Sequence, residues 1–192
     1  MDTNPLPLFG AWFAEAEQSE PNDPNGMTLA TATRDGQPSA RMVLLKGWDR
    51  EGFVFYTNLQ SQKGCELAAN DQVALLFHWK SLRRQVRIEG TAAPVADAEA
   101  DAYFATRPRL ARLGAWASDQ SRPLDSRATL VARVAALEAR YVLGDIPRPP
   151  HWGGYRVRPL RFEFWQDMPF RLHDRALFTR DGDAWRSEKL YP

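Results

Sequence analysis

Cysteine is nearly absent from this chain of 192 residues, and long apolar runs are absent as well. Cys65 has no second cysteine to pair with, so an internal disulfide is excluded and a reducing, cytoplasmic location is expected. No apolar run approaches the length that crosses a bilayer, and the first residues lack the basic and apolar regions of a signal peptide. We therefore expect no membrane association.

Motifs that define several common classes of protein are also missing. The sequence contains no P-loop, no Gly-x-Ser-x-Gly nucleophile turn and no Gly-x-Gly-x-x-Gly after a strand, which argues against a Rossmann domain. The three histidines, at 78, 151 and 173, are too scattered for a metal site, and we predict none. The net charge is only +1, and basic residues do not alternate with aromatic ones, so no nucleic-acid partner is expected.

Lysine is scarce, occurring only at positions 46, 63, 80 and 189, so most basic residues are arginines. Arginine suits a bidentate grip on phosphate and carboxylate groups. Codon bias also raises the arginine content throughout a chain. Only the positions of the arginines can therefore indicate a binding site. The length fits a single domain, 1–192, with a sizeable core.

Hydrophobic periodicity predicts a mainly β protein with some α-helix (α+β). An N-terminal helix and linker occupy 1–26, with the helix at 5–20, and a helical insertion covers about 97–141. Short helices are expected at 61–70, capped by Ser61, at 97–104, capped by Asp97, and after Pro108, with a longer one at 125–141. Strands are expected at 27–33, 39–48, 53–57, 72–79, 83–94, 155–157, 160–166, 169–174 and 184–190. Asp-Gly turns at 35–36 and 181–182 favour hairpins, and the whole pattern favours a closed or partly closed antiparallel barrel with flanking helices.

The run RLHDR is the most informative local pattern. Arg171, His173 and Arg175 are two positions apart, so on a strand their side chains point to one face. Just upstream, Glu163 and Trp165 share a face, while Phe162 and Phe164 share the other. A tryptophan is more often a core residue, but a strand pair with these groups suits a flat, anionic ligand.

Other segments have two explanations each. RMVLLK at 41–46 is an apolar strand with a cation at each end, which solvation of the strand ends explains equally well. Gln85, Arg87 and Glu89 share a face that is either a surface or part of a site. Tyr56 and Thr57, followed by the helix at 61–70, suit a phosphate or simply a capped helix.

In this order and spacing, nine runs resemble the pyridoxine (pyridoxamine) 5′-phosphate oxidase family, over about 27–192. Each run is weak alone, and together they are highly specific. The runs are RMVLLK (41–46), FVFYTN (53–58), LLFHW (75–79), RQVRIEG (84–90), YFATRP (103–108), GAWASDQS (114–121), PPHWGGYRV (149–157), EFWQ (163–166) and RLHDR (171–175).

The resemblance implies a split-barrel fold that binds FMN, and a homodimer with two FMN sites at its interface. It implies oxidation of pyridoxine or pyridoxamine 5′-phosphate to pyridoxal 5′-phosphate, with O₂ reduced to H₂O₂. The implied FMN-binding residues, with Gln120 and Ser121 on the partner side, are Arg41, Met42, Val43, Leu44, Leu45, Lys46, Tyr56, Thr57, Lys63, Gln85, Gln120, Ser121, Trp165 and Arg175. The implied substrate-binding residues are Lys46, Tyr103, Arg107, Arg171, Leu172 and His173.

Within this scheme Arg171 and His173 are the candidate catalytic residues. FMN and substrate each carry a phosphate, so two separate cationic pockets are needed. Hydride transfer from the substrate to the flavin requires close stacking and exclusion of water. We expect Arg171 to hold the substrate and polarise its oxygen or amine, and His173 to assist proton removal.

The chain departs from the family pattern at three places. Gln62 stands where the family has an arginine between Ser and Lys, and Arg84 or another arginine is a candidate to compensate. Ala111 and Arg112 stand where a phosphate-binding serine is usual, and Arg112 either replaces it or faces solvent. An N-terminal Arg/Tyr arm over the substrate is not found at 1–7. Two alternatives therefore stay open: a related FMN oxidase of the phenazine-biosynthesis type, or a flavin- or pyridoxal-phosphate-binding protein without turnover, against which the intact RLHDR run argues.

Overall fold

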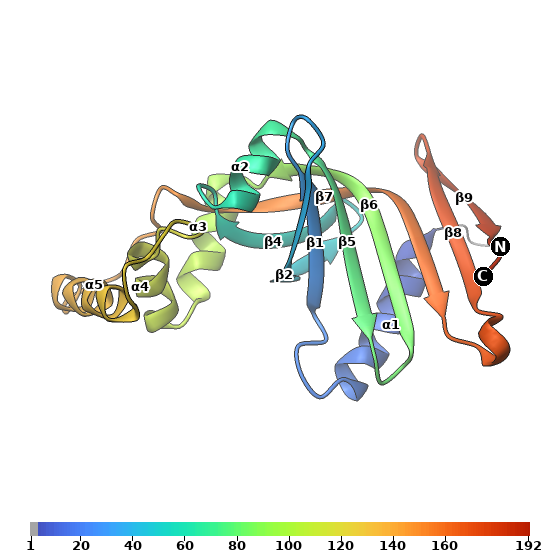
Figure 1. Cartoon of the computed structure of the whole chain (residues 1–192), viewed down its shortest axis with the longest axis horizontal. Helices are drawn as coiled ribbons and strands as arrows, with labels where there is room; N and C mark the ends of the chain where they lie inside the picture. Colours follow the sequence, from blue (N-terminus) through green and yellow to red (C-terminus); the bar gives the residue numbers. More distant parts are fainter. Residues whose placement is uncertain (1–3) are drawn as a thin grey trace.

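A curled antiparallel sheet forms the centre of the protein, with helices at its upper side, at its lower side and at one end (Figure 1). The computed structural model describes residues 4–192, so 1–3 of the expected segment 1–26 lie outside the described residues. The helices are α1 (Pro5–Ser19), α2 (Gln62–Ala69), α3 (Asp97–Thr106), α4 (Arg109–Ala117), α5 (Arg127–Arg140) and the 3-10 turn η1 (Pro169–Arg171). The strands are β1 (Gly26–Ala32), β2 (Pro38–Leu44), β3 (Gly47–Asp49), β4 (Gly52–Asn58), β5 (Gln72–Trp79), β6 (Arg84–Pro94), β7 (Trp152–Gln166), β8 (Asp174–Asp181) and β9 (Ala184–Lys189).

The sheet is split because β7 changes partners along its length. The strand order is β2-β1-β5-β6-β7-β4-β3, and the β8–β9 hairpin also pairs with β7. The first half of β7 pairs with β4, from Trp152 to Val157, and its second half pairs with β8, from Arg161 to Gln166. The predicted mainly β, antiparallel split barrel with flanking helices is confirmed.

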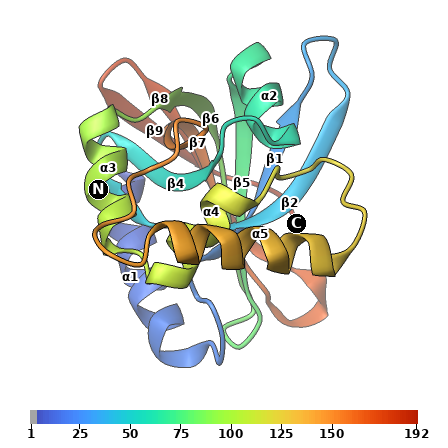
Figure 2. The ribbon, with the colours of Figure 1, turned by 90° about the vertical axis from the view of Figure 1, so that its left-hand side faces the viewer.

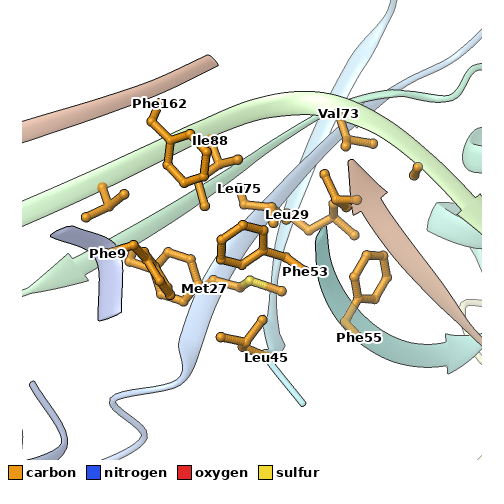
Figure 3. Packing of buried hydrophobic residues seen from close by; sticks show 14 of the residues in the cluster. Phe9, Met27, Leu29, Leu45, Phe53, Phe55, Val73, Leu75, Ile88 and Phe162 are labelled. Atoms are coloured by element: carbon orange, nitrogen blue, oxygen red, sulfur yellow. The ribbon is translucent and has the colours of Figure 1, made fainter. Parts of the chain in front are cut away.

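Aromatic and aliphatic side chains from alternate strand positions fill the barrel (Figure 3). Phe162 and Phe164 are buried there, while their neighbour Trp165 lies on the other face, as the period of two predicts. Phe9 of α1 is fully buried and meets Phe53 edge-on, with ring centroids 4.9 Å apart. Burying such a side chain contributes about 2–3 kcal/mol, which fastens α1 to the barrel.

Two predicted strand boundaries are wrong. The segment 39–48 is two strands, because the chain turns inward at Leu45 and the Lys46 N–H bonds to the carbonyl oxygen of Val54 at 2.8 Å. The segments 155–157 and 160–166 are one strand, β7. Pro159 is tolerated within it because the ladder is irregular there, with a register shift in the partner strand between Glu89 and Gly90.

The strand predicted at 169–174 is also wrong, and this affects RLHDR directly. Pro169–Arg171 is a 3-10 turn, and β8 begins only at Asp174. Phe170 and Arg171 both have positive φ, near 58° and 60°, which is costly for residues other than glycine. Arg171, His173 and Arg175 therefore do not form a row along one strand, and Arg171 is exposed.

Helices α3, α4 and α5 gather at one end of the long axis, and η1 with the β8–β9 hairpin lies at the other (Figures 1 and 2). The predicted cap of α3 is wrong: Ala96 is the N-cap, and Asp97 lies in the first turn. Ser61 caps α2 as predicted, accepting from the Gly64 N–H. No helix within 4–192 has the length and apolar character needed to cross a membrane.

Candidate active site

A cavity of about 680 Å³ lies between the sheet and the helices α3 and α4. It collects residues from β2, β4, α2, α3, α4 and the loop after α4, which are far apart in the sequence. The lining residues are Met42, Val43, Leu44, Lys46, Tyr56, Thr57, Asn58, Lys63, Tyr103, Thr106, Arg107, Pro108, Ala111, Gly114, Ala115, Ser118, Gln120 and Trp152.

Lys63 is the buried cation of this cavity. It lies in the first turn of α2, where backbone N–H groups favour an anion. Its Nζ donates to Oε1 of Gln120 at 3.2 Å, and the Thr57 hydroxyl donates to the same oxygen at 3.4 Å. Burial, followed by the nearby charge of Arg41, lowers the pKa of Lys63. Gln120, which was expected to bind FMN from the partner side, contacts Lys63 and Thr57 within its own chain.

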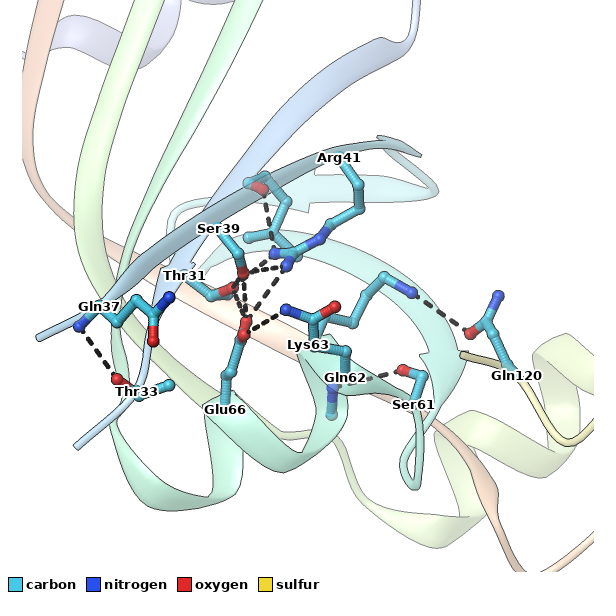
Figure 4. Close-up of polar contacts among 12 residues, drawn as sticks. Thr31, Thr33, Gln37, Ser39, Arg41, Ser61, Gln62, Lys63, Glu66 and Gln120 are labelled. Atoms are coloured by element: carbon cyan, nitrogen blue, oxygen red, sulfur yellow. Dashed lines mark hydrogen bonds and ion pairs between the residues drawn. The ribbon is translucent and has the colours of Figure 1, made fainter. Parts of the chain in front are cut away.

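Arg41 lies beside this cavity but is held by a carboxylate (Figure 4). Its Nη2 is 3.1 Å from Oε2 of Glu66 and also contacts Ser39, while Nη1 donates to Thr31 and to the Leu29 carbonyl. Arg41 is therefore oriented by its own chain, and it does not line the cavity.

Glu66 is the centre of that network. Burial alone would raise its pKa, but hydrogen bonds from Ser39, Thr31, Gln62 and Arg41 lower the pKa of Glu66 to about 2. The carboxylate is therefore ionised at neutral pH.

Neither Arg84 nor Arg112, the two residues named beside the departures from the family pattern, lines this cavity. Gln62 donates to Oε1 of Glu66 at 2.9 Å. Arg84, a candidate to compensate, bonds Gln166 and Glu15 beside α1 instead. Arg112, which was expected to replace the family's phosphate-binding serine or to face solvent, pairs with Asp145 at 2.5 Å and does not line the cavity.

Three rings and a guanidinium form an aromatic wall of the cavity. Tyr56 and Tyr103 stack with centroids 4.0 Å apart, and Tyr56 stacks on Trp152 at 5.3 Å. The Arg107 guanidinium lies over Trp152, 4.9 Å from the ring centroid. Its Nη1 is buried and has no hydrogen-bond partner within 4–192. A buried, unpaired donor on a cation is costly, and an anionic ligand would relieve that cost.

A second cavity of about 680 Å³ lies beside η1. His173 faces it, and its Nδ1 lies 2.9 Å from Oδ1 of Asp167 and 3.3 Å from the Met168 nitrogen. Its ring is 4.7 Å from that of Trp165. These contacts orient the imidazole. The lining residues are His78, Lys80, Arg83, Trp165, Asp167, Met168, Pro169, Phe170, Arg171 and His173.

Strand register places four candidate ligand groups in one row beside this cavity. His78 is opposite Gln85, Gln85 is opposite Trp165, and Trp165 is opposite Arg175. Paired positions in adjacent strands project to the same face. Arg175 is fixed there by Glu163, with 2.7 Å between Nη2 and Oε1.

The predicted residues thus fall into two groups, which no single chain brings together. The first cavity collects Met42, Val43, Leu44, Lys46, Tyr56, Thr57, Lys63, Tyr103, Arg107 and Gln120, and the second collects Trp165, Arg171 and His173 with Gln85 and Arg175 nearby. Helices α3 and α4, which carry part of the first group, and the β8–β9 hairpin beside the second lie at opposite ends of the long axis, while β2 lies between them (Figure 1). Six predicted residues line neither cavity. Arg41 lies beside the first cavity, and Gln85 and Arg175 lie beside the second. Leu45 is buried in the core, Leu172 is exposed, and Ser121 lies in a smaller hollow after α4.

Three residues that line these cavities were not predicted from the sequence: Trp152, His78 and Asp167. Trp152 lies in the quoted run PPHWGGYRV and His78 in LLFHW, but no local pattern pointed to the groups that they contact. Asp167 follows EFWQ directly, and only the turn at η1 brings it to His173.

Comparison with known proteins matches these features to one family. The model described as pyridoxamine 5′-phosphate oxidase matches residues 13–141, and the pyridoxine 5′-phosphate oxidase C-terminal dimerisation region matches 152–192. The chain belongs to the pyridoxamine 5′-phosphate oxidase family. The pyridoxine/pyridoxamine 5′-phosphate oxidase of Sphingopyxis alaskensis is 66% identical over all of this chain and 89% of that protein. That of Gluconobacter oxydans is 63% identical over all of this chain and 96% of that protein.

Two solved structures are similar to this chain. PhzG from Burkholderia lata, in complex with tetrahydrophenazine-1-carboxylic acid, has a TM-score of 0.93 and 35% identity over 99% of this chain and 93% of that chain. A pyridoxamine 5′-phosphate oxidase-related, FMN-binding protein from Nostoc punctiforme has a TM-score of 0.79 at 17% identity, over the full length of both chains. The latter supports the fold alone.

Proposed function

We propose that this protein oxidises pyridoxamine 5′-phosphate or pyridoxine 5′-phosphate to pyridoxal 5′-phosphate, using FMN and reducing O₂ to H₂O₂. The observation that carries the proposal is the pair of separate cationic groups in one cavity. Lys63, with Thr57 and Gln120, is one, and Arg107, with Tyr103 and Trp152, is the other. Two phosphorylated ligands that meet in one site need two such groups.

The residues present fit FMN. Lys63 and the first turn of α2 suit its phosphate, and Thr57 and Gln120 supply further polar groups. Arg41 adds positive charge beside them, although Glu66 balances part of it. When bound, FMN supplies the ring that takes electrons from the substrate and passes them to O₂.

The complete site contains parts of two copies of the chain. Arg171 and His173 lie beside η1, away from Arg107 in the same chain, so a second copy has to supply them. The family's C-terminal dimerisation region, matching 152–192, contains both residues and supports a homodimer. Gln85, Trp165 and Arg175 would then be among the residues that hold FMN, and Ser121 would come from the partner chain.

Within that site Arg107, Lys46 and Tyr103 bind the substrate phosphate. Arg171 holds the substrate and polarises its reacting group. Asp167 and the Met168 N–H both face Nδ1 of His173, so Nε2 is the nitrogen that takes a substrate proton. A His173→Asn variant keeps an amide in place of the ring but cannot titrate, so we expect kcat to fall by about 100-fold or more with KM little changed. Unchanged turnover would refute the proton-transfer role.

The test of the reaction is H₂O₂ release by the purified, FMN-loaded protein. We expect release with both phosphorylated vitamers and none with unphosphorylated pyridoxine. Oxidation of a tetrahydrophenazine carboxylate, the ligand class of the B. lata structure, without oxidation of either vitamer would favour the phenazine-type alternative. A flavin-loaded protein that oxidises neither class would favour a binding protein.

A mixing experiment tests whether two chains share each site. At a substrate concentration below the wild-type KM, Arg107→Ala and Arg171→Ala should each lose most activity, because each damages both sites of its own homodimer. After dissociation and reassociation of an equal mixture, half of the dimers are mixed and each has one intact site, so activity returns to about a quarter of the wild-type value. No recovery in a mixture shown to contain mixed dimers would place all of these residues in one chain's site.

A further inference from the structure

Arg107 has no carboxylate partner among the described residues, unlike two other half-buried arginines of the helical end. Arg112 pairs with Asp145, and Arg148 pairs with Asp97 and Asp101. For Arg107, the described residues supply only aromatic neighbours, and its Nη1 is buried without a hydrogen bond. Burial accordingly lowers the pKa of Arg107.

Trp152 is the nearer of the two rings that face this guanidinium. The Cζ atom of Arg107 is 4.9 Å from the centroid of Trp152 and 5.7 Å from that of Phe104. A ring face attracts a cation through its quadrupole without accepting its N–H groups in strong hydrogen bonds. A carboxylate in the same place would occupy those donors and repel a phosphate.

The indole itself is held rigidly. Trp152 is 6% exposed and lies nearly parallel to Tyr56 and Tyr103, at interplanar angles of 3° and 4°. Phe104 meets it edge-on at 5.0 Å. At the start of β7, the backbone N–H of Trp152 donates to the Pro149 carbonyl oxygen, and the backbone carbonyl of Trp152 accepts from Arg148 at 2.7 Å.

We propose that Trp152 is a positioning residue, which holds the Arg107 guanidinium against its ring so that the Arg107 N–H groups remain free for the substrate phosphate. This inference rests on the proposed function and deepens it. Trp152 fixes Arg107 before the ligand arrives, so less side-chain freedom is lost on binding. The effect of Trp152 on the reaction therefore passes through Arg107 and concerns substrate affinity.

The test compares variants of the FMN-loaded protein with pyridoxamine 5′-phosphate. Trp152→Leu keeps an apolar side chain but removes the ring face, so we expect KM to rise about tenfold, within the range of a desolvated cation–π contact, and kcat to change less than about twofold. Trp152→Phe keeps an aromatic face and should restore KM to within about threefold of wild type. A fall in kcat and flavin content with KM unchanged would overturn the proposal.

Trp116→Leu is the matched control. Trp116 belongs to the same aromatic group, where it meets His151 and donates to the Pro147 carbonyl, but it does not contact Arg107. It should lower the melting temperature as Trp152→Leu does, and leave KM unchanged. A KM rise in the control as large as that of Trp152→Leu would mean that general loosening of the cluster explains both, and would overturn the proposal.

A double-mutant cycle gives the decisive comparison. In an Arg107→Ala background, Trp152→Leu should change KM by less than about twofold, because the guanidinium that Trp152 positions is already absent. A further tenfold rise there would overturn the proposal. If the wild-type protein oxidises neither vitamer, the proposed function fails, and calorimetric titration with inorganic phosphate then provides the same cycle. Phosphate binding weakened by Trp152→Leu only when Arg107 is present would support the positioning role, and equal weakening in both backgrounds would refute it.

Discussion

Glu66→Gln removes a buried charge from the network around Arg41 and provides a sharp test of the electrostatics. Glu66 is 6% exposed and accepts hydrogen bonds from Thr31, Ser39, Gln62 and Arg41. These bonds lower its pKa from 4.5 to about 2. Glutamine has a similar size and cannot ionise, so the variant resembles the protonated state of Glu66.

Proton linkage gives the direction in which stability changes with pH. The folded pKa of Glu66 is lowered, so the unfolded chain binds this proton more tightly and the carboxylate stabilises the fold above pH 4.5. That stabilisation is lost as the pH falls from 4.5 towards 2. At about 1.4 kcal/mol for each unit of pKa, the full contribution is about 3 kcal/mol at pH 7 and about half as much at pH 3.

The assay is denaturant unfolding of ligand-free wild-type and Glu66→Gln protein at one protein concentration, between pH 7 and pH 3. All other carboxylates are common to both proteins, so they cancel in the difference. Glu17→Gln is the control, since Glu17 is exposed on α1 and forms no ion pair within 4–192, and it should give a difference near zero at each pH. A wild-type advantage that does not change with pH would refute the lowered pKa as the source of the stability.

Two further substitutions test the cavity. Lys63→Met removes a buried cation whose Nζ bonds only an amide oxygen within the described chain. The ligand-free protein should therefore become more stable by about 1 kcal/mol. Its affinity for FMN should fall about 10- to 100-fold, because the cation that binds the phosphate is lost. Flavin fluorescence quenching measures this, and riboflavin, which lacks the phosphate, should bind both proteins equally; an equal loss for riboflavin would contradict the phosphate role. Gly154→Ala places a Cβ 2.7 Å from the Tyr56 ring and 2.9 Å from Val95, and should cost about 1–3 kcal/mol by thermal unfolding. Gly114→Ala, where a Cβ meets nothing within 4 Å on a helix, should instead be neutral or stabilising, and the reverse order would contradict the packing argument.

Local patterns predicted much of the fold because they report directly on burial. Gln85, Arg87 and Glu89 were predicted to share one face of a strand, and Val86 and Ile88, on the opposite face, are fully buried. The Asp35-Gly36 turn forms as predicted, with Gly36 at φ 90°, because glycine adopts that conformation at little cost. Boundaries failed where an irregular backbone interrupts a favourable pattern, as at Pro159 within β7.

The site was predictable only in part, because its polar partners are distant in sequence. Arg175 was expected to meet flavin, and the structure adds that Glu163 holds it. His173 was expected in a row with Arg171 and Arg175, whereas the turn at η1 sets it against Asp167. No periodicity in RLHDR indicates a residue with positive φ, so the direction of Arg171 could not be inferred.

The sequence by itself determined which strand faces are apolar, where the hairpins turn and that the chain resembles a family of oxidases, because these depend on residue type and short spacing. The tertiary structure decided how the charges are partnered. Arg41 meets a carboxylate 25 residues away, while Arg107 meets rings and no carboxylate within 4–192. Both are partly buried arginines, and only the packing of α2, α3 and β7 makes one a balanced charge and the other a donor without a partner.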